Sequence, residues 1–185
     1  MADDQSTALY LITPPRLEDP AAFAEALKAA LDVGGAHCVQ LRLKDVDDDS
    51  IRRVADILRP VTQDRDVAFV MNDRPDLARE TGCDGVHVGQ DDASYADARA
   101  LLGPDVIIGV TCKESRHLAV EAAEAGADYV AFGAFFGSTT KTTTVQASPG
   151  SLAWWSHTTS GPSVAIVALT PAHDGALVTP GAQFA

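Results

Sequence analysis

The sequence predicts an α/β fold, namely a (β/α)₈ barrel that lacks most of its eighth strand and its final helix, formed as one domain over residues 1–185. Short apolar runs alternate with helical patterns, which is typical of parallel strands joined by crossover helices. A motif of a helix-ending glycine, a small residue, a short turn and a strand recurs at residues 35–39, 82–86 and 126–130. A fourth copy, residues 181–185, stands where the eighth strand would begin.

The elements follow from apolar spacing and from helix-ending residues. Asp19 before Pro20 predicts the start of a helix that ends at Gly34, and a second helix is expected to stop near Pro60. A further helix is predicted over residues 117–125, and another carries Trp154 and Trp155. The expected strands are residues 8–12, 39–43, 67–71, 85–88, 106–110, 129–132 and 164–167.

The rival fold is a doubly wound open sheet. That fold usually carries a glycine-rich GxGxxG or GxxxxGK[ST] loop after its first strand, and neither is present here. The observation favours the (β/α)₈, or TIM, barrel, although 185 residues is below the roughly 200 at the lower end of that fold.

Composition excludes several classes of function. A formal net charge of −12 argues against a nucleic-acid binder and a polybasic membrane binder. No apolar run is long enough for a spanning helix, and the acidic N-terminus does not resemble a signal peptide. Cys38, Cys83 and Cys112 are odd in number and far apart, which predicts a reducing, cytoplasmic location.

Polar residues after the second expected strand predict an anion site. Gln40, Arg42 and Lys44 are spaced two residues apart, so on an extended chain they share one face. Two cations and an amide at the carboxyl end of a barrel strand suit a phosphate or a pyrophosphate. The alternative is an exposed edge with solvated charges.

Carboxylates follow the next two strands. Asn72 and Asp73 come after one strand, and Asp92 comes after the other. Side chains from neighbouring strand ends suit Mg²⁺, which takes oxygen ligands together with substrate phosphates. The alternative is that Asp73 and Asp92 cap the following helices.

Later strand ends carry hydroxyl groups and one more cation. Thr111 follows the fifth strand, either as a ligand contact or as a helix cap, whereas Cys112 has no base partner that would make it a nucleophile. Ser138, Thr140 and Lys141 follow the sixth strand and predict an oxyanion-binding loop, with a polar linker as the alternative. His87 is more readily explained as a packed, hydrogen-bonded histidine than as a ligand.

Five blocks of sequence together resemble the thiamine-phosphate synthase family, also called thiamine-phosphate pyrophosphorylase. They are residues 11–13, 39–44, 71–73, 85–92 and 108–111, and the resemblance runs from about residue 8 to residue 184. The family is a (β/α)₈ barrel that joins hydroxymethylpyrimidine diphosphate to thiazole phosphate, giving thiamine phosphate and pyrophosphate. The resemblance therefore implies a transferase of thiamine biosynthesis that binds small molecules, uses Mg²⁺ and is in many cases a homo-oligomer.

The resemblance also implies roles by position. Contacts to the pyrimidine diphosphate are implied for Gln40, Arg42, Lys44, Asn72, Thr111 and Lys141, contacts to the thiazole phosphate for Ser138 and Thr140, and Mg²⁺ ligation for Asp73 and Asp92. Together with Mg²⁺, the cations Arg42, Lys44 and Lys141 are expected to stabilise the charge on the departing pyrophosphate.

The sequence departs from the family pattern in its last third. Residues 137–141 lack the proline of the usual Pro-Thr-x-Thr-Lys loop, and Val167-Ala168 stand where the family has Gly-Gly. The family's phosphate loop after the eighth strand is absent. The alternatives are therefore an inactive or weakly active remnant that binds only Mg²⁺-diphosphate, or the related thiazole tautomerase.

Overall fold

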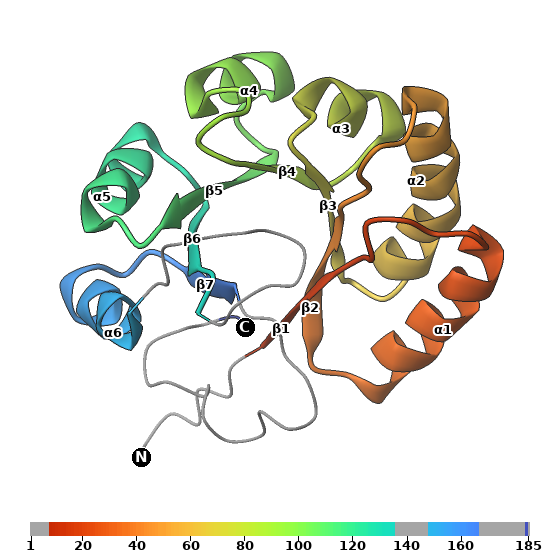
Figure 1. Ribbon diagram of the computed structural model, residues 1–185, viewed down its shortest axis with the longest axis horizontal. Coiled ribbons are helices and arrows are strands. Elements are labelled where there is room, and N and C mark those ends of the chain that lie inside the picture. The colour runs from red at the N-terminus through yellow and green to blue at the C-terminus, as the bar shows by residue number, and fades with distance from the viewer. Residues whose placement is uncertain (1–7, 136–147, 167–183, 185) are drawn as a thin grey trace. The chain divides into compact units, whose positions relative to one another are not determined.

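The computed structural model describes residues 8–135, 148–166 and 184, in which strands and helices alternate along the chain (Figure 1). Two compact units are present, Leu9–Ile108 and Gly109–Ala185 with Met1–Ala8. Among the described residues, none of the helices combines the length and the hydropathy needed to cross a membrane.

The first unit holds four βα pairs. Its elements are β1 (Leu9–Ile12), α1 (Pro20–Val33), β2 (Ala36–Leu41), α2 (Asp48–Gln63), β3 (Ala68–Asn72), α3 (Pro75–Thr81), β4 (Gly85–Val88) and α4 (Tyr95–Leu102). β5 (Ile107–Lys113) begins in this unit and continues into the second, which contains α5 (Arg116–Ala125), β6 (Tyr129–Gly133), α6 (Pro149–Thr158) and β7 (Ser163–Ile166). Each of the seven expected strands is present, with its bounds shifted by a few residues at most.

The strands of the first unit are parallel and buried. β1 pairs with β2, β2 with β3, and β3 with β4, in a register that sets Leu41 beside Met71 and Asn72 beside His87. The side chains of Phe69 and Val70 point to opposite faces of β3, yet both are fully buried. Burial on both faces explains why these strands appear in the sequence as continuous apolar runs. The helices α1 to α4 lie along one side of the strands (Figure 1).

Helix boundaries depend on short polar side chains. The carboxylate of Asp19 accepts hydrogen bonds from the backbone N–H groups of Ala21 and Ala22, at 3.1 and 3.0 Å, and Pro20 follows at the first helical position. This confirms the predicted start of α1.

The predicted end of α2 near Pro60 is wrong, because the helix continues to Gln63. Pro60 removes one intrahelical hydrogen bond, but the chain regains bonds on either side. The backbone N–H of Asp64 donates to the carbonyl of Pro60 at 3.1 Å, and Thr62 Oγ1 donates to the carbonyl of Arg59 at 2.8 Å. Leu58 and Thr62 are fully buried, so packing holds the last turn in place.

In the second unit, β5, β6 and β7 are parallel neighbours. Trp155 packs α6 against β6. Its side chain is buried and meets Phe132 edge-on with ring centroids 5.9 Å apart, and its Nε1 donates to the carbonyl of Gly161 at 2.8 Å. Phe184 forms isolated parallel bridges with Val164 of β7 and with Ala8. Among the described residues, Phe184 alone represents the predicted beginning of an eighth strand.

Replacing Gly85 by alanine should lower the free energy of unfolding by about 1–3 kcal/mol, because the core cannot accept the added methyl group without shifting. A Cβ at Gly85 would lie 2.5 Å from the carbonyl oxygen of Ile107 and 2.8 Å from its Cβ. Urea unfolding of the variant and the wild type measures the change.

The control is Gly150→Ala in α6, where the nearest atom to the added Cβ would be Ser148 Oγ at 3.4 Å. This change should alter stability by no more than about 0.5 kcal/mol. Equal stability losses in the two variants would refute the close approach of β4 and β5 at Ile107.

Candidate active site

The carboxyl ends of β2, β3 and β4 bring together the polar residues predicted for diphosphate and metal binding. Gln40 lies near the end of β2, is buried, and donates from Nε2 to Tyr10 Oη of β1 at 3.1 Å. Arg42 and Lys44 follow the last residue of β2 and are half-buried. Asn72 ends β3 and Asp73 follows it, while Asp92 lies four residues beyond the end of β4.

Thr13 holds in place the backbone that carries the side chains of Arg42 and Lys44. Its N–H donates to the carbonyl of Gln40 at 3.0 Å, and its Oγ1 accepts from the backbone N–H of Arg42 at 2.9 Å. The backbone N–H of Lys44 then donates to the carbonyl of Pro15 at 2.9 Å. The segment after β1 therefore holds residues 40–44 in an extended path beyond the sheet.

Lys44 and Asp73 form an ion pair at this edge, with Nζ 2.9 Å from Oδ2. Asp73 adopts a left-handed backbone conformation, φ 62°, and its N–H donates to the carbonyl of His87 at 2.8 Å. Such a conformation costs of order 1 kcal/mol outside glycine and is tolerated best by Asp and Asn. The turn therefore directs the Asp73 carboxylate toward Lys44 at a modest cost in stability.

The carboxyl groups of Asp73 and Asp92 are neighbours and act on each other's ionisation. Burial and then the adjacent Asp73 carboxylate raise the pKa of Asp92. Burial acts to raise the pKa of Asp73 as well, but hydrogen bonds from Lys44 and Asp92 outweigh it and hold that pKa below its usual value. Two such carboxyl groups share a proton readily, and a divalent cation that replaces the proton relieves their repulsion.

The helix-capping alternative for the two aspartates is wrong. The N-cap position of α3 is Arg74, which makes no side-chain capping bond, and the N-cap of α4 is Ser94, whose Oγ accepts from the N–H of Asp97 at 3.1 Å. Asp92 Oδ2 instead accepts from the backbone N–H of Gly89 at 3.0 Å. Both carboxyl groups are thus available for a cation rather than bound to a helix start.

His87 is a buried, uncharged neighbour of this site, as the sequence suggested. Burial lowers its pKa to about 4, with Arg42 adding to the decrease and Asp73 opposing it. An imidazole with this pKa is uncharged at neutral pH, so it does not act there as a cationic general acid.

Thr111 lies within β5 rather than after it, because that strand extends to Lys113. The capping alternative for Thr111 is wrong, since the Oγ of Ser115 accepts from the N–H of Leu118 at 3.2 Å and caps α5. Cys112 is fully buried, and burial raises its pKa to about 12, which agrees with the view that it is no nucleophile. Thr111 belongs to the second unit, whereas the residues at the ends of β2, β3 and β4 belong to the first.

Three predicted site residues, Ser138, Thr140 and Lys141, lie outside the described residues, as do Val167 and Ala168. Sequence reasoning also missed two residues that organise the described site, Tyr10 and Thr13. Thr13 stood in one of the blocks that carry the family resemblance, but no local signal distinguished its hydroxyl from any other at a strand end.

Within the described ranges, no group of three or more His, Cys, Asp or Glu side chains could hold a metal by itself. Two carboxylates alone leave most of the coordination sphere of a hard cation open. Mg²⁺ sites in enzymes that act on phosphates have this composition, with one or two carboxylates completed by water and by substrate oxygens. Cations and paired carboxylates at the carboxyl ends of parallel βα units are typical of the active sites of β/α-barrel enzymes.

Comparison with known proteins gives the family within that class. Residues 9–185 match the thiamine monophosphate synthase family. The thiamine-phosphate synthase of Rhodospirillum centenum is 57% identical over 176 residues, which span 95% of this chain and 84% of that protein. The thiamine-phosphate synthase of Hyphomonas neptunium is 45% identical over 182 residues, or 96% of this chain and 82% of that protein. The chain belongs to the thiamine monophosphate synthase family.

A solved structure confirms the predicted fold class. The thiamine phosphate pyrophosphorylase of Pyrococcus furiosus matches 96% of this chain and 83% of its own, with a TM-score of 0.79 and 28% sequence identity. The resemblance stated from the five sequence blocks is thereby confirmed at the level of both family and fold.

The histidine environment leads to a pH-dependent prediction. The folded-state pKa of about 4 lies below the ordinary value of 6.5, so neutral His87 contributes stability above pH 6.5 that is lost as the pH falls toward 4. We expect the free energy of unfolding of the wild type to fall by about 3 kcal/mol over this interval relative to His87→Gln.

Chemical denaturation of both proteins at several pH values measures this difference. The carboxyl groups that titrate in the same interval are present in both proteins, so their contribution cancels in the comparison. A histidine signal assigned to His87 by NMR that titrates near 6.5 would contradict the prediction.

Proposed function

We propose that this chain is a transferase that condenses hydroxymethylpyrimidine diphosphate with thiazole phosphate, yielding thiamine phosphate and pyrophosphate. Family membership supports the reaction, and one structural observation supports the site. Lys44 and the neighbouring carboxyl groups of Asp73 and Asp92 lie together at the carboxyl ends of adjacent parallel strands. A cation beside a carboxylate pair suits a diphosphate that binds as its metal complex.

The pyrimidine diphosphate is bound, in this proposal, by Gln40, Arg42, Lys44 and Asn72. In the unliganded protein Lys44 neutralises Asp73, so neither charge is left uncompensated in a partly buried site. A bound diphosphate would offer its oxygens to the Lys44 ammonium, and the Asp73 carboxylate would then be free to help hold Mg²⁺. The ion pair thus holds both groups close to their working positions before the substrate arrives.

Asp73 and Asp92 are the residues that would hold Mg²⁺, and they fit it because their carboxyl groups are adjacent. When bound, Mg²⁺ supplies positive charge to diphosphate oxygens, which makes pyrophosphate a better leaving group.

The reaction needs charge stabilisation and alignment more than proton transfer. The bond between the pyrimidine methylene carbon and the diphosphate oxygen breaks, and its electron pair leaves with pyrophosphate. The thiazole nitrogen then donates its lone pair to the methylene cation, forming the new carbon–nitrogen bond. Arg42 and Lys44 stabilise the growing negative charge on the leaving group. Gln40 is buried, so its side chain has little freedom and limits the motion of the part of the pyrimidine substrate that it contacts.

The remaining residues are assigned through the family pattern. Thr111 and Lys141 complete the contacts to the pyrimidine diphosphate, Lys141 adds charge stabilisation, and Ser138 and Thr140 bind the thiazole phosphate. A cytoplasmic location and a homo-oligomeric state stay predictions.

Asp73→Asn and Asp92→Asn are each expected to weaken Mg²⁺-dependent binding of hydroxymethylpyrimidine diphosphate by about tenfold or more, because each removes a charged oxygen ligand with little change of shape. Calorimetric titration of the full chain, with and without Mg²⁺, measures the dissociation constants. The matched control is Asp56→Asn, an exposed carboxylate of α2, which should bind as the wild type does. A wild-type dissociation constant that is the same with and without Mg²⁺ would overturn the assignment of the two aspartates.

Turnover separates a synthase from a remnant that binds only the diphosphate. Adding thiazole phosphate to the enzyme, Mg²⁺ and hydroxymethylpyrimidine diphosphate should release pyrophosphate and form thiamine phosphate in equal amounts. Tight Mg²⁺-dependent binding without pyrophosphate release would favour the remnant.

A further inference from the structure

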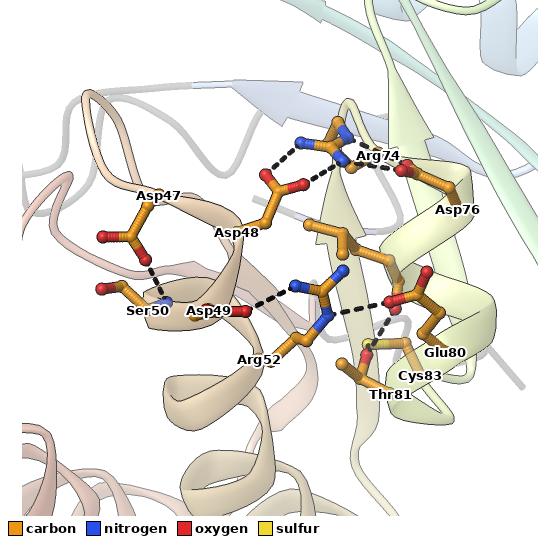
Figure 2. A network of polar contacts seen from close by, with 11 residues as sticks. Asp47, Asp48, Asp49, Ser50, Arg52, Arg74, Asp76, Glu80, Thr81 and Cys83 are labelled. Carbon is orange, nitrogen blue, oxygen red and sulfur yellow. Dashed lines mark hydrogen bonds and ion pairs between the residues drawn. The ribbon is translucent and has the colours of Figure 1, made fainter.

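Arg52 and Arg74 each join α2 to α3 through an ion pair (Figure 2). Only Arg74 is the sequence neighbour of a proposed metal ligand, Asp73. Arg52 donates to Asp49 on its own helix at 2.9 Å and to Glu80 near the end of α3 at 2.8 Å. Arg74 stands at the other end of α3, directly after Asp73, and binds the first residue of α2. The two side chains are equally exposed, at 38% and 37%.

The guanidinium group of Arg74 is held by two carboxylates at once. It donates to both oxygens of Asp48, at 2.6 and 2.8 Å, and to both oxygens of Asp76, at 2.9 and 2.6 Å. Figure 2 shows Arg74 between Asp48 of α2 and Asp76 of α3. The hydrogen bonds from these two carboxylates raise the pKa of Arg74 above its usual value.

We propose that Arg74 is a positioning residue for the metal site: through its paired hydrogen bonds to Asp48, it holds the turn that carries Asp73 against the loop that carries Lys44. The proposal rests on the proposed function, because it assigns Asp73 and Lys44 the roles given there.

The need for a second link follows from the chemistry of binding. Lys44 lies in the β2–α2 connection and Asp48, the first residue of α2, ends that connection, while Asp73 and Arg74 belong to the same β3–α3 turn. These two segments are joined once by Lys44 and Asp73 and once by Asp48 and Arg74. Binding of the metal diphosphate breaks the first link, since both of its members change partner. The second link involves neither member and keeps the segments together while the exchange occurs.

The geometry explains why the residue is an arginine. Two parallel hydrogen bonds to one carboxylate fix its direction as well as its distance, whereas a lysine ammonium makes a point contact that can swing. The backbone of Asp73 is in the left-handed region, which costs free energy for a residue other than glycine. If the ion pair with Asp48 were lost, this turn would therefore shift toward a less strained conformation and move the Asp73 carboxylate. Arg74 therefore acts on the metal ligand next to it without touching the metal.

The test uses the full chain and magnesium pyrophosphate, which contains the metal and the leaving group without allowing turnover. Arg74→Lys keeps the charge and loses the paired geometry, and Asp48→Asn alters the same link from the other side. Each should raise the calorimetric dissociation constant of magnesium pyrophosphate by about tenfold, the range known for groups that orient metal ligands. The double variant should be little worse than either single one, because both changes break one link.

The matched control is Arg52→Lys, which loosens the other ion pair between the same two helices. It should lower the melting temperature about as much as Arg74→Lys but change the dissociation constant less than about twofold. Equal weakening by Arg52→Lys and Arg74→Lys, or wild-type binding by Arg74→Lys, overturns the inference and leaves the proposed function standing. Failure of the wild type itself to bind magnesium pyrophosphate overturns both.

Discussion

The parallel pairing of β2, β3 and β4 is the constraint on which the site depends. Its register sets Leu41 beside Met71 and Asn72 beside His87, so the chain leaves successive strands at one edge. Residues more than 25 positions apart in sequence, such as Lys44 and Asp73, therefore meet within 2.9 Å. A shift of one residue in any strand would turn the inward side chains outward and separate these groups. The buried Phe69 and Val70 penalise such a shift, which links core packing directly to the positions of the polar residues.

The charged groups of the site compensate one another. Lys44 compensates Asp73, Asp92 is protonated more readily than an ordinary aspartate, and His87 stays neutral. Partly buried groups that cancel one another in this way cost less to desolvate than isolated charges. A metal diphosphate complex would compensate the same side chains, because its metal is a positive partner for the two carboxylates and its phosphates are a negative partner for Lys44. Under the proposed function, binding of the metal diphosphate would thus exchange one set of charge partners for another.

How far the sequence predicted the structure differs between the fold and the site. The strands were predictable because strands buried on both faces are continuous apolar runs. The end of α2 was not predictable. The free-energy cost of Pro60 can be estimated from the local sequence, but the burial of Leu58 and Thr62 that offsets it depends on contacts with the rest of the fold. Asp73 and Asp92 were predicted to lie close together, but the sequence did not exclude that they cap helices, and only the observed N-caps Arg74 and Ser94 rule this out. Arg74 was missed because its partner Asp48 lies 26 residues away, with no spacing that marks the pair.

The connection between β2 and α2 also has a kinetic consequence. Together with the first turn of α2 it carries Asp45, Asp47, Asp48 and Asp49 shortly after Lys44, on a protein whose formal net charge is already −12. Three of these carboxylates are paired with arginines, so the repulsion that a free diphosphate meets comes from the net negative charge of the protein. It acts mainly within about 8 Å, the screening length at physiological salt. Added salt should therefore speed the encounter with the free anion, contrary to ordinary electrostatic steering. A diphosphate that has already bound a divalent cation carries less charge and meets less repulsion, so the faster route into the site is arrival as the preformed complex.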